Sequence, residues 1–155
     1  MKNYPLLLLL FCCTLFFTAC SSDDDDSPSK EDMLKNKRWQ ITAASAAVPF
    51  FGSVDFYANL KDCQRDNYFE FQANGVLLIN EGATKCTALS PQQVQGSWSL
   101  NGDIMTIQGL GATLGLPSDK LEIKLTDLSS TSLTGEFSLD YNGLPVTVKV
   151  TMRTM

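Results

Sequence analysis

The sequence predicts a single all-β domain, an antiparallel up-and-down barrel of about eight strands preceded by a short helical turn. Three observations indicate this fold class. Apolar residues alternate with polar ones through most of residues 31–155, as in strands that bury one face. Three of these segments end in Asn-Gly, a pair that favours tight hairpin turns. Successive hairpins leave two unpaired sheet edges unless the sheet closes into a barrel.

The expected elements follow one another with mostly short connections. Residues 31–36 are expected to form the helical turn. The expected strands are 39–43, 68–72, 76–80, 97–100, 104–108, 121–126, 133–141 and 146–152. The expected hairpin turns are Asn74-Gly75, Asn101-Gly102 and Asn142-Gly143. Eight strands enclose enough space for packed side chains or for one small ligand, and an open β-sandwich is the alternative.

Residues 1–19 are typical of an export signal. Lys2 supplies a positive start, and the apolar segment Leu6–Phe17 spans about a dozen residues, fewer than the roughly 20 that a membrane-spanning helix needs. The segment Phe17-Thr18-Ala19-Cys20 resembles a lipoprotein processing site, with phenylalanine where leucine is usual. We therefore expect cleavage before Cys20 and a diacylglyceryl lipid on its thiol, which would anchor the protein stably to a membrane. An ordinary signal peptide cut nearby is the alternative.

Residues 20–30 are expected to be the lipidated cysteine and a disordered tether. The tether contains serines and the run Asp23–Asp26, which cannot bury apolar surface. Acidic residues directly after a lipidated cysteine resemble the surface-export signal of lipoproteins in one branch of Gram-negative bacteria. This resemblance implies an outer-membrane lipoprotein whose domain faces outward. A periplasmic orientation, with the run serving only as a solvated spacer, is the alternative.

Composition excludes several classes of function. The 155 residues carry 12 basic and 17 acidic side chains, a net charge of −5, and no basic patch, so nucleic acid is a poor candidate partner. The chain has no histidine, which removes the commonest general base, the usual nucleophile triads and histidine metal ligands. Carboxylates are plentiful, but no pair is placed like an acid–base dyad. We expect neither an enzyme nor a metal or cofactor site.

Cys63 and Cys86 are the only cysteines in residues 31–155. Export would place them in an oxidising compartment, where a disulfide is favoured. Such a bridge, 23 positions apart in the chain, would stabilise the fold by about 3 kcal/mol. A reactive thiol and a zinc site remain alternatives, although zinc needs about four ligands and two cysteines without histidine are too few.

Short motifs in a fixed order resemble the lipocalin-like domain of small Gram-negative lipoproteins. The motifs are Trp39, Cys63-Gln64-Arg65-Asp66-Asn67, Phe69-Glu70-Phe71 with Asn74-Gly75, Cys86, and the segment from Gly96 to Asp103. The resemblance runs from about Leu34 to the C-terminus. It implies a barrel and a location in the cell envelope, and it implies no catalytic residues.

A barrel of this kind predicts binding of a small apolar or amphipathic molecule. The residues expected to line the interior are Trp39, Phe69, Phe71, Trp98, Phe137 and Tyr141. The same residues could instead fill a solid core. An accessory or protein-interaction subunit of an envelope complex is the alternative function.

Two connections have unusual composition. The first, between Ile41 and Tyr68, is long and includes Phe50 and Phe51, which could form a lid over the barrel or plug its end. The second, Gly109–Gly115, is glycine-rich but lacks the lysine of a phosphate-binding loop, so we expect a simple connection at the barrel mouth.

Overall fold

A computed structural model describes residues 28–141 and 143–155. The predictions for the export segment, for the lipid on Cys20 and for most of the tether lie outside the described residues. The third expected turn lies partly outside them, at Asn142.

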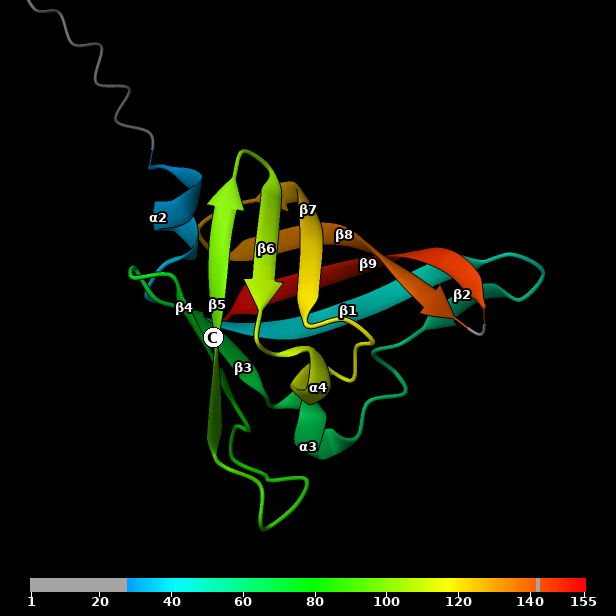
Figure 1. The fold of residues 1–155 in the computed structure, drawn as a ribbon, viewed down its shortest axis with the longest axis horizontal. Coiled ribbons are helices and arrows are strands. Elements are labelled where there is room, and N and C mark those ends of the chain that lie inside the picture. Colours follow the sequence, from blue (N-terminus) through cyan, green and yellow to red (C-terminus); the bar gives the residue numbers. More distant parts are fainter. Residues whose placement is uncertain (1–27, 142) are drawn as a thin grey trace, which may run out of the picture.

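The described residues form three short helices and nine strands (Figure 1). The helices are α2 (Lys30–Leu34), α3 (Asp62–Arg65) and α4 (Gly111–Leu114). The strands are β1 (Arg38–Val48), β2 (Gly52–Asp55), β3 (Tyr68–Phe71), β4 (Val76–Asn80), β5 (Gln93–Asn101), β6 (Ile104–Gln108), β7 (Lys120–Leu128), β8 (Ser132–Tyr141) and β9 (Leu144–Thr154).

Eight of the strands close into an antiparallel barrel, which confirms the predicted fold class. From β3 to β9 each strand pairs with the next, and β1 pairs with β3 on one side and β9 on the other. Trp39 lies opposite both Phe69 of β3 and Thr154 of β9, so the ring has no free edge at that level. Gly75 and Gly102 take positive φ angles of 77° and 59° in the two described hairpin connections. The second turn is one residue later than expected, because Asn101 still pairs with Ile104 and the turn consists of Gly102 and Asp103.

The connection between Ile41 and Tyr68 is more ordered than expected. The first strand continues to Val48 and then turns back as β2, which pairs with the end of β1 and lies outside the ring. A register irregularity after Ile41 shifts the alternation of inward and outward side chains by one residue. As a result, Ala44, Ala46 and Val48 face the interior, and Ala43 is exposed. The expected strand 39–43 was therefore too short, and Ala43 does not share the buried face of Trp39.

Apolar side chains seal one end of the barrel. Leu34 of α2 and Trp39 are completely buried, and the indole N–H of Trp39 donates a hydrogen bond to the Leu34 carbonyl at 3.0 Å. The indole N–H of Trp98 donates to the Gln72 carbonyl at 3.0 Å, and its ring packs edge-on against Phe71. Both buried indoles thus have hydrogen-bond partners, as a stable core requires.

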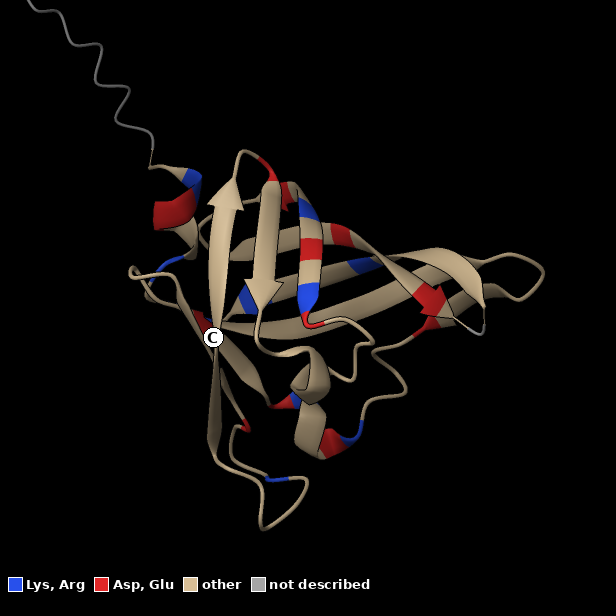
Figure 2. Cartoon of the chain, viewed as in Figure 1, with Lys and Arg blue, Asp and Glu red and all other residues tan. Residues whose placement is uncertain are grey.

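Strands β1, β8 and β9 extend past the barrel wall toward β2 (Figure 1). A second small core lies in this extension, built on Ala46, Val48, Val146 and Val148. Charged side chains occupy outward positions, as along β7, where Lys120, Glu122 and Lys124 alternate with apolar residues (Figure 2). The alternation leaves the inward faces of the strands apolar.

Replacing Leu34 with alanine should lower the free energy of unfolding by about 2–5 kcal/mol, because the substitution leaves a cavity in the sealed end. Urea denaturation followed by tryptophan fluorescence measures this loss. Met33→Ala is the matched control, since Met33 precedes Leu34 on the same helical turn and is only partly buried. Equal losses for the two variants would contradict a sealing role for Leu34.

Candidate functional site

The barrel contains a partly open cavity of about 180 Å³, hereafter the barrel cavity. Its lining side chains are all apolar and come from β1, β3, β6, β7, β8 and β9 and from the α4 connection. Phe69, Phe71 and Phe137 supply the aromatic part of the wall, and Ile107 and Ile123 are among the aliphatic residues. A surface without hydrogen-bonding groups favours an apolar occupant over water.

Three of the six expected lining residues contact the barrel cavity, namely Phe69, Phe71 and Phe137. The other three do not line it. Trp39 and Trp98 are buried in the sealed end, where their indole N–H groups are hydrogen-bonded. Tyr141 lies in the extension and packs edge-on against Phe56 at a centroid distance of 5.7 Å.

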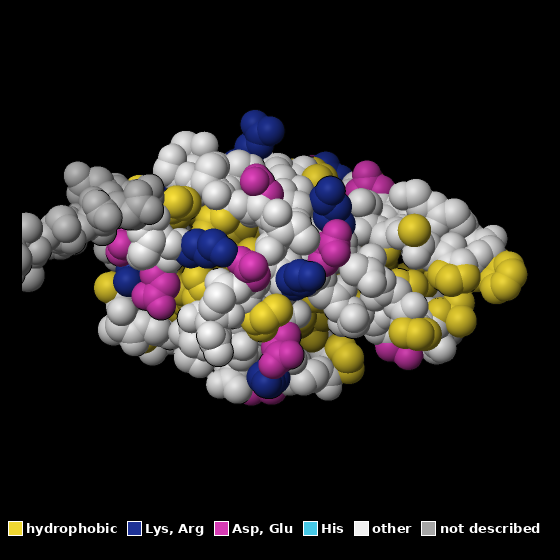
Figure 3. Space-filling model, turned by 90° about the horizontal axis from the view of Figure 1, so that it is seen from above, with side chains coloured by type: hydrophobic (Ala, Val, Ile, Leu, Met, Phe, Trp, Pro, Cys, Tyr) yellow, Lys and Arg dark blue, Asp and Glu magenta, His cyan; other side chains and the backbone are white. Residues whose placement is uncertain are grey.

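The expected lid residues do not cover the cavity in this structure. Phe50 and Phe51 occupy the turn between β1 and β2, where Phe50 is fully exposed and Phe51 is 74% exposed. Hydrophobic side chains gather at this end of the molecule, opposite the end that carries α2 (Figure 3). Neither ring lines the barrel cavity or plugs the core.

The α4 connection, residues 109–119, lies at the mouth of the barrel, as the sequence predicted, and covers part of the cavity. Leu114 and Leu116 point from it into the barrel cavity. Its base is fixed by Asp119, whose carbonyl accepts a hydrogen bond from Gly109 N and whose carboxylate accepts one from Gly111 N. The feature of the sequence that could have predicted this cover is the pair Leu114 and Leu116, in and just after the glycine-rich segment.

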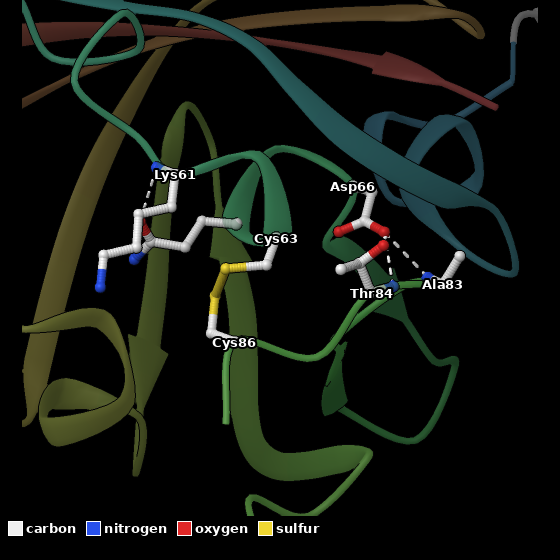
Figure 4. The surroundings of a disulfide bond; sticks show 7 residues. Lys61, Cys63, Asp66, Ala83, Thr84 and Cys86 are labelled. Carbon is white, nitrogen blue, oxygen red and sulfur yellow. Dashed lines mark hydrogen bonds between the residues drawn. A yellow bond between two sulfur atoms is a disulfide. The ribbon is translucent and has the colours of Figure 1, made fainter. Parts of the chain in front are cut away.

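A disulfide joins Cys63 of α3 to Cys86 in the connection between β4 and β5, with an S–S distance of 2.02 Å (Figure 4). Next to it, one carboxylate oxygen of Asp66 accepts hydrogen bonds from the backbone N–H groups of Ala83 and Thr84, at 2.9 and 2.8 Å. The bridge and these bonds hold α3 against the connection at the mouth end of the barrel. The two cysteines therefore form neither a free thiol nor a zinc site in this structure.

A second hollow of about 300 Å³, hereafter the mouth pocket, lies between α3, the β4–β5 connection and α4. Ile79 and Val94 form its apolar part. Its polar part includes Asn67 and Glu81. Oδ1 of Asn67 and Oε2 of Glu81 are buried and accept no hydrogen bond from the part of the chain that the structure describes. Sequence analysis missed this pocket because polar residues that follow a strand look like ordinary loop residues.

The charged groups with shifted pKa values lie around α2, away from both hollows. A hydrogen bond from Lys30 and the positive charge of Lys30 lower the pKa of Asp103. A hydrogen bond to Glu31 is the largest of the effects that raise the pKa of Lys35. Asp103 is exposed and Lys35 is partly buried, and neither lines the barrel cavity or the mouth pocket.

Two further searches covered only residues 28–141 and 143–155. Within them, no three histidine, cysteine or carboxylate side chains are grouped closely enough to hold a metal ion. In the same part of the chain, no helix is long and apolar enough to cross a membrane.

Comparison with known proteins identifies the fold. No protein-family model and no curated protein matches the sequence. The chain is similar to the crystal structure of a lipocalin-like protein from Bacteroides uniformis, with a TM-score of 0.50 and 23% identity over 79% of this chain and 99% of that one. It also aligns with bovine odorant-binding protein in complex with a selenium-containing odorant, with a TM-score of 0.44 and 12% identity over 83% of this chain and 74% of that one. The first likeness, together with the closed eight-stranded ring, shows that the chain has a lipocalin-like fold.

Proposed function

We propose that the protein is a binding protein, rather than an enzyme, and that it holds a small apolar or amphipathic molecule inside the barrel. The barrel cavity carries this proposal, because every side chain that lines it is apolar. Apolar cavities of about 150 Å³ stay dry and bind molecules the size of benzene. A cavity of about 180 Å³ fits a single ring or a short alkyl chain.

The affinity of such a ligand follows from the apolar surface that it buries. Each buried methylene contributes about 0.8 kcal/mol, so a chain of about eight carbons contributes at most roughly 6 kcal/mol. That free energy corresponds to a dissociation constant of tens of micromolar. Binding of this strength also raises the apparent stability of the folded protein in proportion to ligand concentration.

Octanol should bind the purified protein, and Ala44→Phe should weaken this binding by about tenfold or more, because the added ring occupies the barrel cavity. Isothermal titration calorimetry measures both affinities. Ala43→Phe is the matched control, since Ala43 is the exposed neighbour on the same strand and should leave the affinity within about twofold. If both variants bind octanol as the unmodified protein does, the ligand does not occupy the barrel cavity.

We also propose that the protein is anchored to a membrane. The barrel would be held through a lipid on Cys20 at the outer membrane, facing outward, as the sequence before and after that cysteine suggests. The described chain begins beside α2, at the sealed end of the barrel (Figure 1). An anchor that precedes α2 leaves the mouth of the barrel, at the opposite end, accessible to a ligand.

Replacing Cys20 with alanine should release the protein from the membrane fraction and abolish the added lipid mass, because the thiol that would carry the lipid is gone. Cell fractionation and intact-mass spectrometry give the two readouts. Replacing Cys12 and Cys13 with alanine is the control, since both lie in the segment expected to be removed. A lipid-modified Cys20→Ala protein that stays in the membrane would disprove anchoring at this position.

A further inference from the structure

We infer that the ligand is an amphiphile with a hydrogen-bond-donating cationic head, such as a primary alkylammonium. Its tail would lie in the barrel cavity and its head in the mouth pocket, against Asn67 and Glu81. This inference rests on the proposed function, because it names the class of molecule that the barrel binds.

Asn67 and Glu81 continue the inward-facing rows of two neighbouring strands. Phe69 of β3 is paired with Ile79 of β4, and both are buried and face the interior. Extending the same antiparallel register by two residues at the mouth end places Asn67 opposite Glu81. Because side chains alternate along a strand, residues two apart lie on the same face. The apolar interior therefore ends in a pair of oxygen acceptors at the mouth.

These acceptors have no donor among residues 28–141 and 143–155. Oδ1 of Asn67 and Oε2 of Glu81 are buried without a hydrogen-bond partner. Among the described residues, Glu81 also takes part in no ion pair. A buried acceptor that lacks a donor destabilises the ligand-free protein, and the effect is larger when the acceptor is charged. Because both oxygens are buried, the side chains of Asn67 and Glu81 must rotate toward the mouth pocket to meet a ligand, and one that brings N–H donors and a positive charge would then satisfy both.

Other occupants fit the mouth pocket less well. An anionic head would meet the carboxylate of Glu81, and an uncharged chain would leave both acceptors unpaired. Calcium and magnesium need six or more oxygen ligands, and two side-chain acceptors do not provide them. Asp66 also has an unpaired oxygen, but it does not line the pocket, and its second oxygen is engaged with Ala83 and Thr84.

Residues that line the two hollows are close together in the chain. Asn67 lines the mouth pocket, and Phe69, two residues later, lines the barrel cavity. In an extended strand the Cα atoms of residues two apart are separated by about 7 Å. On the opposite side, Thr113 lines the pocket while the adjacent Leu114 lines the cavity. The chain entering β3 and helix α4 thus each carry neighbouring residues that line the proposed head site and the proposed tail site.

The volumes support a shared ligand. Small-molecule sites usually measure about 300–1,000 Å³, and the barrel cavity alone, at about 180 Å³, lies below this range. The mouth pocket adds about 300 Å³ of space with both polar and apolar walls. A molecule that uses both hollows would fill a site well within this range.

Calorimetric titration of the purified protein with octylammonium, octanoate and octanol tests this inference. The three probes share one alkyl tail and differ only in the head. Octylammonium should bind at least about tenfold more tightly than octanoate. Glu81→Gln should weaken octylammonium by about fivefold or more and leave octanol within about twofold. Glu122→Gln, which removes the same charge from the exposed face of β7, should change neither affinity.

The outcomes separate this inference from the proposed function. If octanol binds but octylammonium is not favoured over octanoate, or if the two glutamine variants behave alike, the cationic head site is refuted and the apolar site remains. If none of the three probes binds, the proposed function fails as well. Should Glu81→Gln lose octanol binding through misfolding, the ratio of octylammonium to octanoate affinity in the unmodified protein decides the question.

Discussion

The pairing of β1 with β9 is the contact on which the other features of the structure depend. It joins the first and last strands of the ring, and β1 also pairs with β3, so every barrel strand has two neighbours. Without this closure the inward rows of apolar residues would face solvent, and no interior would exist to hold a ligand. The irregularity after Ile41 keeps Ala44, Ala46 and Val48 on the interior side, so β1 also carries the second core.

The two ends of the barrel differ because different kinds of side chain cover them. Leu34, Trp39 and Trp98 seal one end with large groups whose polar atoms are hydrogen-bonded. At the other end short segments lie across the mouth, and the Cys63–Cys86 bridge fixes one of them. Protein interiors are usually packed without large voids, so an apolar hollow behind this lighter cover is the feature most suggestive of binding.

The sequence predicted the barrel well because its signals are local. Strand alternation and Asn-Gly turns located the eight ring strands, and the two cysteines outside the export segment form the expected bridge. It could not separate Trp39 from Phe69, because plugging an end and lining a cavity require the same apolar character. Leu114 in a glycine-rich loop and Glu81 after a strand were missed for a related reason, since only closure of the ring brings them to one mouth.

A crystal structure of the protein under xenon pressure tests the central claim most directly, namely that the barrel contains a dry apolar cavity. Xenon enters such cavities without needing a polar partner. We predict a xenon atom within contact distance of Phe69, Phe137 and Leu116, inside the barrel. A barrel filled by repacked side chains, or one that holds ordered water and excludes xenon, would contradict the account.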